Sequence, residues 1–170
     1  MLNKIIGTSQ LNSALLCSRK EGVKVSSNHI IDCSAPPFVP DGWEVVKHDT
    51  TRERIHWNPR RVELYLTPSQ KADAAAEART VFAELNPLPL LNANILDYLL
   101  EHQELIPKEW RDEDREVFFW GTVYRDHQGF ECVRSLIWSP RVQWNWETRW
   151  LDGEPLLDID CAAVLKIRRH

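Results

Sequence analysis

The fold is decided by residues 117–150, which read VFFWGTVYRDHQGFECVRSLIWSPRVQWNWETRW. Apolar and polar side chains alternate through this stretch with a period of two, which is typical of strands with one buried face. Turn signals interrupt the alternation at residues 126–129 (DHQG) and at Ser139-Pro140. The stretch therefore predicts a C-terminal three-stranded antiparallel meander, with strands at 117–125, 130–138 and 142–150.

The two turns also predict which residues lie opposite each other. We expect a register that pairs position 125 with 130 and position 138 with 142. This register places Gly121 and Trp146 on either side of Arg134. One face of the meander is then almost wholly apolar and is expected to be the core face: Val117, Phe119, Val123, Cys132, Leu136, Trp138, Trp144 and Trp146, with Arg134 as its only charge.

The other face of the meander mixes rings with polar groups and is the candidate binding surface. Flat aromatic side chains beside amides and carboxylates can hold a protein partner or a small polar ligand. The alternative is that the helices cover this face as a second core layer. Together with Arg134, the candidate binding residues are Phe118, Trp120, Tyr124, Glu131, Gln143 and Asn145.

Upstream of residue 117 the sequence predicts short strands and two central helices, which makes the fold class α+β. Residues 67–70 (TPSQ) form a capping box with proline at the first helical position, so a helix is expected from there to Asn86-Pro87. A second helix is expected to begin near Asn92 or Asn94, with Asp97 in its first turn. The expected N-terminal strands follow a proline-rich loop and lie at 43–48, 54–57 and 61–66.

Length and charge limit the organisation and the partners. The 170 residues suit one domain at 30–170 preceded by an N-terminal extension at 1–29. A net charge of −4 disfavours nucleic acid, which binds mainly through excess Lys and Arg. No apolar run is long enough to span a membrane, and residues 1–16 are too broken by polar residues for a signal peptide. We therefore expect a cytoplasmic protein.

Three motifs resemble those of a family of small uncharacterised bacterial proteins. They are LNANILDYLL at 91–100, LIPKEW at 105–110 and FFWGTVYRD at 118–126, followed by a tryptophan-rich end. The family pattern reads L-N-A-N-x-L-D-Y-L-L, then L-I-P-x-x-W, then F-F-W-G-T-x-Y-R. The resemblance covers about residues 30–165, and it implies membership of the family without implying a reaction, because no activity is established for that family.

Arg134 is the most informative single residue, because a guanidinium inside an apolar face needs partners for five donors. Gly121 leaves room above the backbone, and the ring of Trp146 can accept a cation. We expect a structural cation–π stack closed by one carboxylate such as Asp152. The alternative is a receptor for an anion or carboxylate at the centre of the sheet.

Other chemistry-bearing residues give weaker signals. Asp97, Glu101 and Glu104 share one side of the second helix, where a solvated acidic face is favoured over acid–base catalysis. The histidines occur singly and the four cysteines lie far apart, so neither a metal nor a cofactor is expected, and the thiols are expected to be free. A basic cluster, expected to be a solvated hairpin or else a contact for an acidic protein or nucleic acid, comprises Arg52, Arg54, Arg60 and Arg61.

These observations favour one function over another. We expect a non-catalytic binding or interaction module that uses the aromatic face. The alternative is a small hydrolase or transferase whose site is gathered from Arg134, Tyr124 and Asp97.

Overall fold

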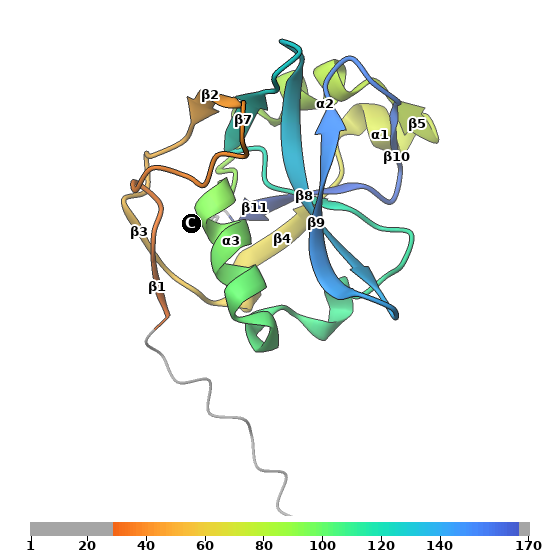
Figure 1. Ribbon diagram of the computed structural model, residues 1–170. Helices are drawn as coiled ribbons and strands as arrows, with labels where there is room; N and C mark the ends of the chain where they lie inside the picture. The colour runs from red at the N-terminus through yellow and green to blue at the C-terminus, as the bar shows by residue number, and fades with distance from the viewer. Residues whose placement is uncertain (1–28, 167–170) are drawn as a thin grey trace, which may run out of the picture.

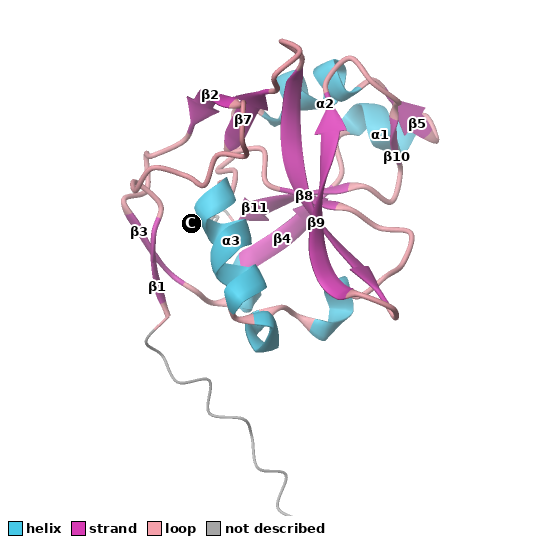
Figure 2. Cartoon of the chain, viewed as in Figure 1, coloured by secondary structure: helices cyan, strands magenta, loops and turns pink. Residues whose placement is uncertain are grey.

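A computed structural model describes residues 29–166, so the N-terminal extension expected at 1–29 lies almost wholly outside the described residues. The α+β class is confirmed (Figures 1 and 2). The helices are α1 (Pro68–Ala72), α2 (Ala78–Leu85) and α3 (Ala93–Glu101), with 3-10 turns η1 (Pro59–Arg61), η2 (Gln103–Leu105) and η3 (Lys108–Trp110). The strands are β1 (Ile30–Asp32), β2 (Glu44–His48), β3 (Arg54–His56), β4 (Val62–Tyr65), β5 (Ala75–Ala76), β6 (Val117–Phe118), β7 (Thr122–Arg125), β8 (Glu131–Ser139), β9 (Gln143–Trp150), β10 (Leu156–Leu157) and β11 (Cys161–Leu165).

The central sheet has seven strands and forks at β8. Cys132 of β8 pairs with Tyr124 of β7 and with Trp150 of β9, and Val117 of β6 pairs with Leu136 further along β8. Because β9 pairs with β8 over residues 132–139, β6 and β7 share the opposite edge of β8. β6 continues in parallel to β11 and then to β4, whereas β7 continues to β2.

The fork corrects the expected meander, because its first strand is broken. A continuous register from the pair Val117 and Leu136 would put Thr122 opposite Glu131, but Arg125 stands there. Three residues are therefore looped out at positions 119–121. Since side chains alternate across a strand, an odd insertion turns the side chains of β7 to the opposite face. The expected pairing of position 125 with 130 is also wrong, because the turn after β7 spans residues 126–130 and Arg125 pairs with Glu131.

The register of β9 also differs from the expectation, by a shift that keeps every side chain on its face. Ser139 pairs with Gln143 and Trp138 with Trp144, so the turn lies at 140–142. The Ser139 hydroxyl accepts a hydrogen bond from the amide of Val142 across this turn. The turn lies one residue later than expected, so each residue of β8 pairs with a residue two positions further along β9. Trp146 consequently lies opposite Leu136 rather than Arg134.

Each face of the sheet has its own hydrophobic core. The α3 face includes Phe119 and Leu136, which pack with Leu96 and Leu99 of the helix. The opposite face buries Phe118 and Trp120 with residues of α2 and β11. Figure 1 shows α3 beside the β1–β3 pair at one side of the molecule and α1 and α2 near β5 and β10 at the other.

The helix expected from residue 68 to residue 85 is interrupted. The predicted capping box is present at Thr67, and α1 begins there, but α1 ends at Ala72. Residues 75–76 then form β5, which pairs with β10. The side-chain amide of Gln70 donates to the carbonyl oxygens of Leu157 and Asp160 at 2.9 and 2.7 Å, which ties α1 to the same segment. This tertiary pairing competes with helix continuation, and a helical period in the sequence cannot show it.

Candidate functional site

The structure buries the aromatic face that the sequence singled out for binding. Phe118 and Trp120 are both fully buried, and the ring of Phe82 on α2 stacks on Trp120 with centroids 5.3 Å apart. The expected alternative, a second core layer under the helices, is therefore what the fold contains. A ligand at the surface cannot reach these two rings.

Tyr124 lies on the other face of the sheet from Phe118 and Trp120. The three residues looped out before β7 turn the Tyr124 side chain to the opposite face of the sheet. Its ring packs there against Ala93 and Cys132. The phenol donates a hydrogen bond to the carbonyl oxygen of Phe38 at 3.0 Å. Burial raises the pKa of Tyr124 above its ordinary value, so the hydroxyl stays protonated and donates.

The polar members of the expected site are scattered. Gln143 occupies a left-handed turn position with φ 60° and donates from its side-chain amide to the carbonyl of Pro140. Asn145 accepts a hydrogen bond from the neighbouring amide of Trp146 at 2.8 Å. Both side chains thus serve the turn and the free edge of β9. Neither converges with the aromatic residues on a common ligand position.

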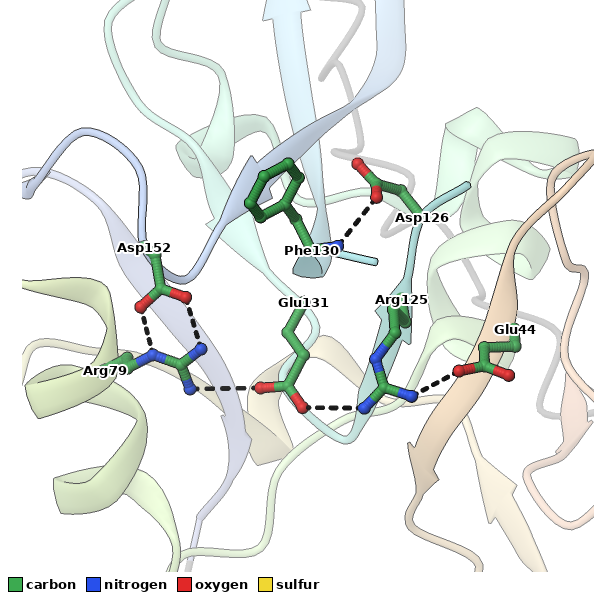
Figure 3. Close-up of polar contacts among 7 residues, drawn as sticks. All are labelled: Glu44, Arg79, Arg125, Asp126, Phe130, Glu131 and Asp152. Carbon is green, nitrogen blue, oxygen red and sulfur yellow. Dashed lines mark hydrogen bonds and ion pairs between the residues drawn. The ribbon is translucent and has the colours of Figure 1, made fainter. Parts of the chain in front are cut away.

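Glu131 belongs to a chain of ion pairs that crosses the surface (Figure 3). It bridges Arg79 of α2, at 3.1 Å, and Arg125 of β7, at 3.4 Å. Arg79 also pairs with Asp152, and Arg125 with Glu44. Every charge in the chain has an oppositely charged neighbour, so the chain joins β2, β7, β8, α2 and the loop after β9 without offering a free charge.

Arg134 is buried at 1% exposure, and both terminal nitrogens of its guanidinium have a structural partner, whereas its Nε has no hydrogen-bond partner within residues 29–166. Its guanidinium makes two hydrogen bonds to Asp97, at 2.7 and 3.1 Å. The rings of Trp146 and Phe38 lie 4.3 and 5.3 Å from its central carbon. The predicted stack with Trp146 is present, because the two-residue shift in register leaves both side chains on one face. The closing carboxylate is Asp97 and not Asp152, which pairs with Arg79.

The residues of the hydrolase alternative therefore meet, but in bonds that hold the fold together. Asp97 neutralises Arg134, and Tyr124 donates to a main-chain carbonyl of the proline-rich loop. Two asparagines at the start of α3 also donate hydrogen bonds to main-chain carbonyls near this loop, at residues 32–35 and at Asp49. The amide of Asn92 donates to the carbonyls of Cys33 and Asp49, and that of Asn94 to the carbonyls of Asp32 and Ala35. The polar residues of the LNANILDYLL motif thus bind neighbouring segments and have a structural role.

The FFWGTVYRD motif supplies the other half of this junction. A Cβ atom on Gly121 would lie 2.8 Å from the carbonyl oxygen of Leu91 and 2.9 Å from Cα of Asn92, so only glycine fits there. Thr122 accepts a hydrogen bond from the amide of Ala93, the first residue of α3, at 2.9 Å. Helix α3 begins where expected, with Asn92 as its N-cap residue, but Asn92 makes no side-chain cap bond and Asp97 lies beyond the first turn in which it is expected.

A shallow groove of about 300 Å³ runs between α3 and the β1 segment. Its acidic lining residues are Asp32, Asp97 and Glu101. Asp97 is bonded to Arg134, and hydrogen bonds from the side chain and amide of Ser34 lower the pKa of Asp32. Glu104, the third expected carboxylate, lies 3.7 Å from His102 instead. The three carboxylates of the expected helix face therefore do not form one site.

A more enclosed pocket of about 150 Å³ lies beside β3, and we call it the arginine pocket. Its polar lining consists of the guanidinium-bearing Arg52, Arg54 and Arg61, with His56 and Asn58. Its apolar lining consists of Ile55, Trp57, Val62 and Leu165. Trp57 is held in place by a hydrogen bond from its indole nitrogen to the carbonyl of Leu105 at 3.2 Å.

The guanidinium groups of the arginine pocket have no protein partner among residues 29–166. Arg52, Arg54 and Arg61 form no ion pair and no side-chain hydrogen bond with the described chain. The charge of Arg52 acts on Asp49 and that of Arg54 on Asp32, but neither carboxylate lines the pocket. The sequence had marked these arginines only as a basic cluster. What it could not show is that three of them border one hollow.

Cysteine and metal chemistry find no support in the described part of the chain. Cys33, Cys132 and Cys161 are free and buried, and burial raises the pKa of their thiols to about 11, 12 and 11. Such thiols are poor nucleophiles. Residues 29–166 contain no cluster of three or more metal-ligating side chains, and none of their helices could cross a bilayer.

Comparison of the chain with protein-family models, with curated proteins and with solved structures finds no match in any of the three. The function is therefore argued from the geometry of the chain itself.

Proposed function

We propose that this chain is a small non-catalytic binding module whose ligand is an anion held in the arginine pocket. The observation that carries the proposal is that Arg52, Arg54 and Arg61, all exposed, line one hollow to which no carboxylate of the described chain contributes. Like charges placed together repel one another, and a bound anion relieves this repulsion. The pocket also combines a few polar groups with an apolar wall, as binding sites for small ligands do.

This proposal keeps the class of function expected from the sequence but moves its site. The aromatic face is core, so the proposed contact surface moves from the sheet to the segment formed by β3 and η1. A cytoplasmic location belongs to the same proposal. Its support is that the described cysteines are free and buried, which suits a reducing compartment.

The alternative reading, a hydrolase or transferase around Arg134, has less support. Its three groups are close together, but Asp97 is already bonded to Arg134, and Tyr124 to the carbonyl of Phe38 in the proline-rich loop. A reaction would have to break those bonds before either group could act on a substrate.

The test is a thermal-shift measurement with a panel of anions, namely phosphate, sulfate, malonate and citrate. The protein should be stabilised in a saturable way by at least one of them. The double variant Arg52→Gln/Arg54→Gln should lose the stabilisation. The control is Arg60→Gln/Arg141→Gln, which removes the same charge outside the pocket and should keep it. Equal stabilisation of both double variants, or no stabilisation by any anion, overturns the proposal.

A further inference from the structure

We infer that the ligand of the arginine pocket is a small phosphomonoester, meaning one phosphate group on a short carbon skeleton. The inference rests on the proposed anion-binding function and narrows it to a chemical class. It draws on the number and origin of the charged groups, on the size of the pocket and on the chemistry of its walls.

The charged groups favour phosphate over a single carboxylate. Arg52 lies in the loop before β3, Arg54 begins β3 and Arg61 ends the turn η1, so the arginines come from two separate segments. A carboxylate offers two oxygens in one plane, which one guanidinium satisfies. A phosphate carries more charge and three acceptor oxygens around one atom, so several donors can bind it at once.

The size of the pocket limits what accompanies the phosphate. About 150 Å³ corresponds to a few water molecules at roughly 30 Å³ each. Sites for drug-sized ligands begin at about 300 Å³. The arginine pocket is therefore too small to enclose a nucleotide, but it can hold a phosphate and a few carbon atoms.

The walls indicate that those carbon atoms are present. Trp57 and Val62 are buried residues of the core, and Ile55 and Leu165 complete the apolar side of the pocket. A free inorganic phosphate would leave this side in contact with water. A short carbon skeleton would cover it and would gain from burial of apolar surface.

Arg60 provides a control within the same turn. It precedes Arg61 but does not line the pocket, and its carbonyl oxygen accepts a hydrogen bond from the Lys166 ammonium at 2.9 Å. If the anion bound to a diffuse positive surface, Arg60 and Arg61 would contribute equally to its affinity. If it binds in the arginine pocket, Arg61 contributes and Arg60 does not.

The experiment is isothermal titration calorimetry of the full chain at pH 7.5 with glycerol 3-phosphate, inorganic phosphate, succinate and glycerol as probes. Glycerol 3-phosphate and succinate carry similar charge, so the comparison isolates the phosphate group. We expect glycerol 3-phosphate to bind at least about tenfold more tightly than succinate and more tightly than inorganic phosphate. Arg61→Gln should weaken its binding about tenfold or more, and Arg60→Gln less than about twofold.

The contrary outcomes separate the two proposals. Succinate binding as tightly as glycerol 3-phosphate overturns the phosphomonoester class and leaves the anion pocket standing. A single-stranded oligonucleotide, titrated as a fifth probe, also overturns it if it binds more tightly than glycerol 3-phosphate and loses affinity equally with Arg60→Gln and Arg61→Gln. That result points to an extended nucleic-acid surface. Failure of every anion to bind overturns both proposals, provided that circular dichroism shows each protein to be folded.

Discussion

At the scale of single residues, the distinction that matters is between arginines that are bonded and arginines that are not. Arg134 sits in the core with Asp97 and two rings around it, and its exposed fraction is 1%. The arginines of the pocket have no such partners in the described chain. The sequence pointed to Arg134 because one charge stands out in an apolar alternation, and it correctly anticipated Trp146 as a neighbour.

Removing the Arg134 guanidinium should strongly destabilise the protein. Arg134→Met leaves Asp97 without its cation beside the core, and loss of one partner of a buried pair costs about 3–5 kcal/mol. Because the Asp97 side chain is 27% exposed, we expect the lower part of that range. Urea unfolding measures the loss. Arg141→Met, on an exposed turn, is the control and should cost less than about 0.5 kcal/mol. A loss below about 1 kcal/mol for Arg134→Met would show that the pair is not a structural clamp.

At the scale of elements, the junction between α3 and the broken strand organises the fold. The looped-out residues 119–121 were not predictable from alternation, because each of them fits an unbroken strand when only its polarity is considered. Gly121 is the one residue of the three whose type indicates a break in the strand. The sequence alone suggests that its missing side chain leaves room for Arg134, whereas the space is occupied by the backbone of Leu91 and Asn92. Strand β11 was missed because its short apolar run, residues 161–165, has no alternation of its own.

Gly121→Ala tests that junction. The new methyl group would meet backbone atoms at 2.8–2.9 Å, so α3 or the strand must move. Overpacking of this kind costs about 1–3 kcal/mol, and we expect the upper part of the range because backbone cannot rotate away. Chemical denaturation gives the value. For comparison, Gly129→Ala has open space but a positive φ, and should cost about 1 kcal/mol. Equal costs at the two glycines would contradict the close approach.

Trp120→Ala tests whether the aromatic face is core. Truncation of a fully buried tryptophan stacked on Phe82 should cost about 3–5 kcal/mol and lower the melting temperature markedly. Binding of anions by the fraction that remains folded should be unchanged, because Trp120 does not line the arginine pocket. A melting temperature close to that of the natural protein would instead return this face to the list of contact surfaces.

At the scale of the whole molecule, ion pairs between arginines and carboxylates hold the fold, whereas the arginines that line the pocket have no ion-pair partner in the described chain. The net charge of −4 disfavours a general polyanion binder, but an average over the chain cannot reveal a local excess of cations. Residues 52–61 hold four arginines and one glutamate. Which of these arginines line the pocket depends on how β3 pairs with β1. A strand of three residues is too short to show a period from which that pairing could be predicted.

The carboxylates predict how stability depends on pH. Although burial by itself raises the pKa of Asp126, hydrogen bonds from Trp150, Phe130 and Gln128 outweigh it and hold the pKa below 3.8. A lowered pKa in the folded state gives stability that is present above the unfolded value and is lost as the pH falls through the folded one. The pKa values of Asp32, Asp49, Glu84 and Asp152 are also lowered, whereas that of Asp160 is raised. The free energy of unfolding should therefore decrease as the pH is lowered below about 4.

Asp126→Asn isolates one carboxylate in that profile. The variant should be less stable than the natural protein at pH 7, and the difference should shrink as the pH falls below 3.8, where the natural carboxylate takes up its proton. Urea unfolding at pH 7, 4 and 3 measures it. Asp41→Asn, whose carboxylate accepts no hydrogen bond within residues 29–166, should leave the profile unchanged. A difference that stays constant with pH would contradict the assigned hydrogen bonds.

The most direct test of the central claim, that binding belongs to the arginine pocket and not to the aromatic face, is a phosphate titration followed in the amide and indole region of the NMR spectrum. The eight tryptophans provide reporters across the molecule. We predict saturable shifts of the amides of residues 52–61 and of the indole of Trp57, which lines the pocket. The indole of Trp120 should stay unmoved. Saturable shifts centred on Trp120 and its neighbours, or shifts spread evenly over all exposed residues, would contradict the account.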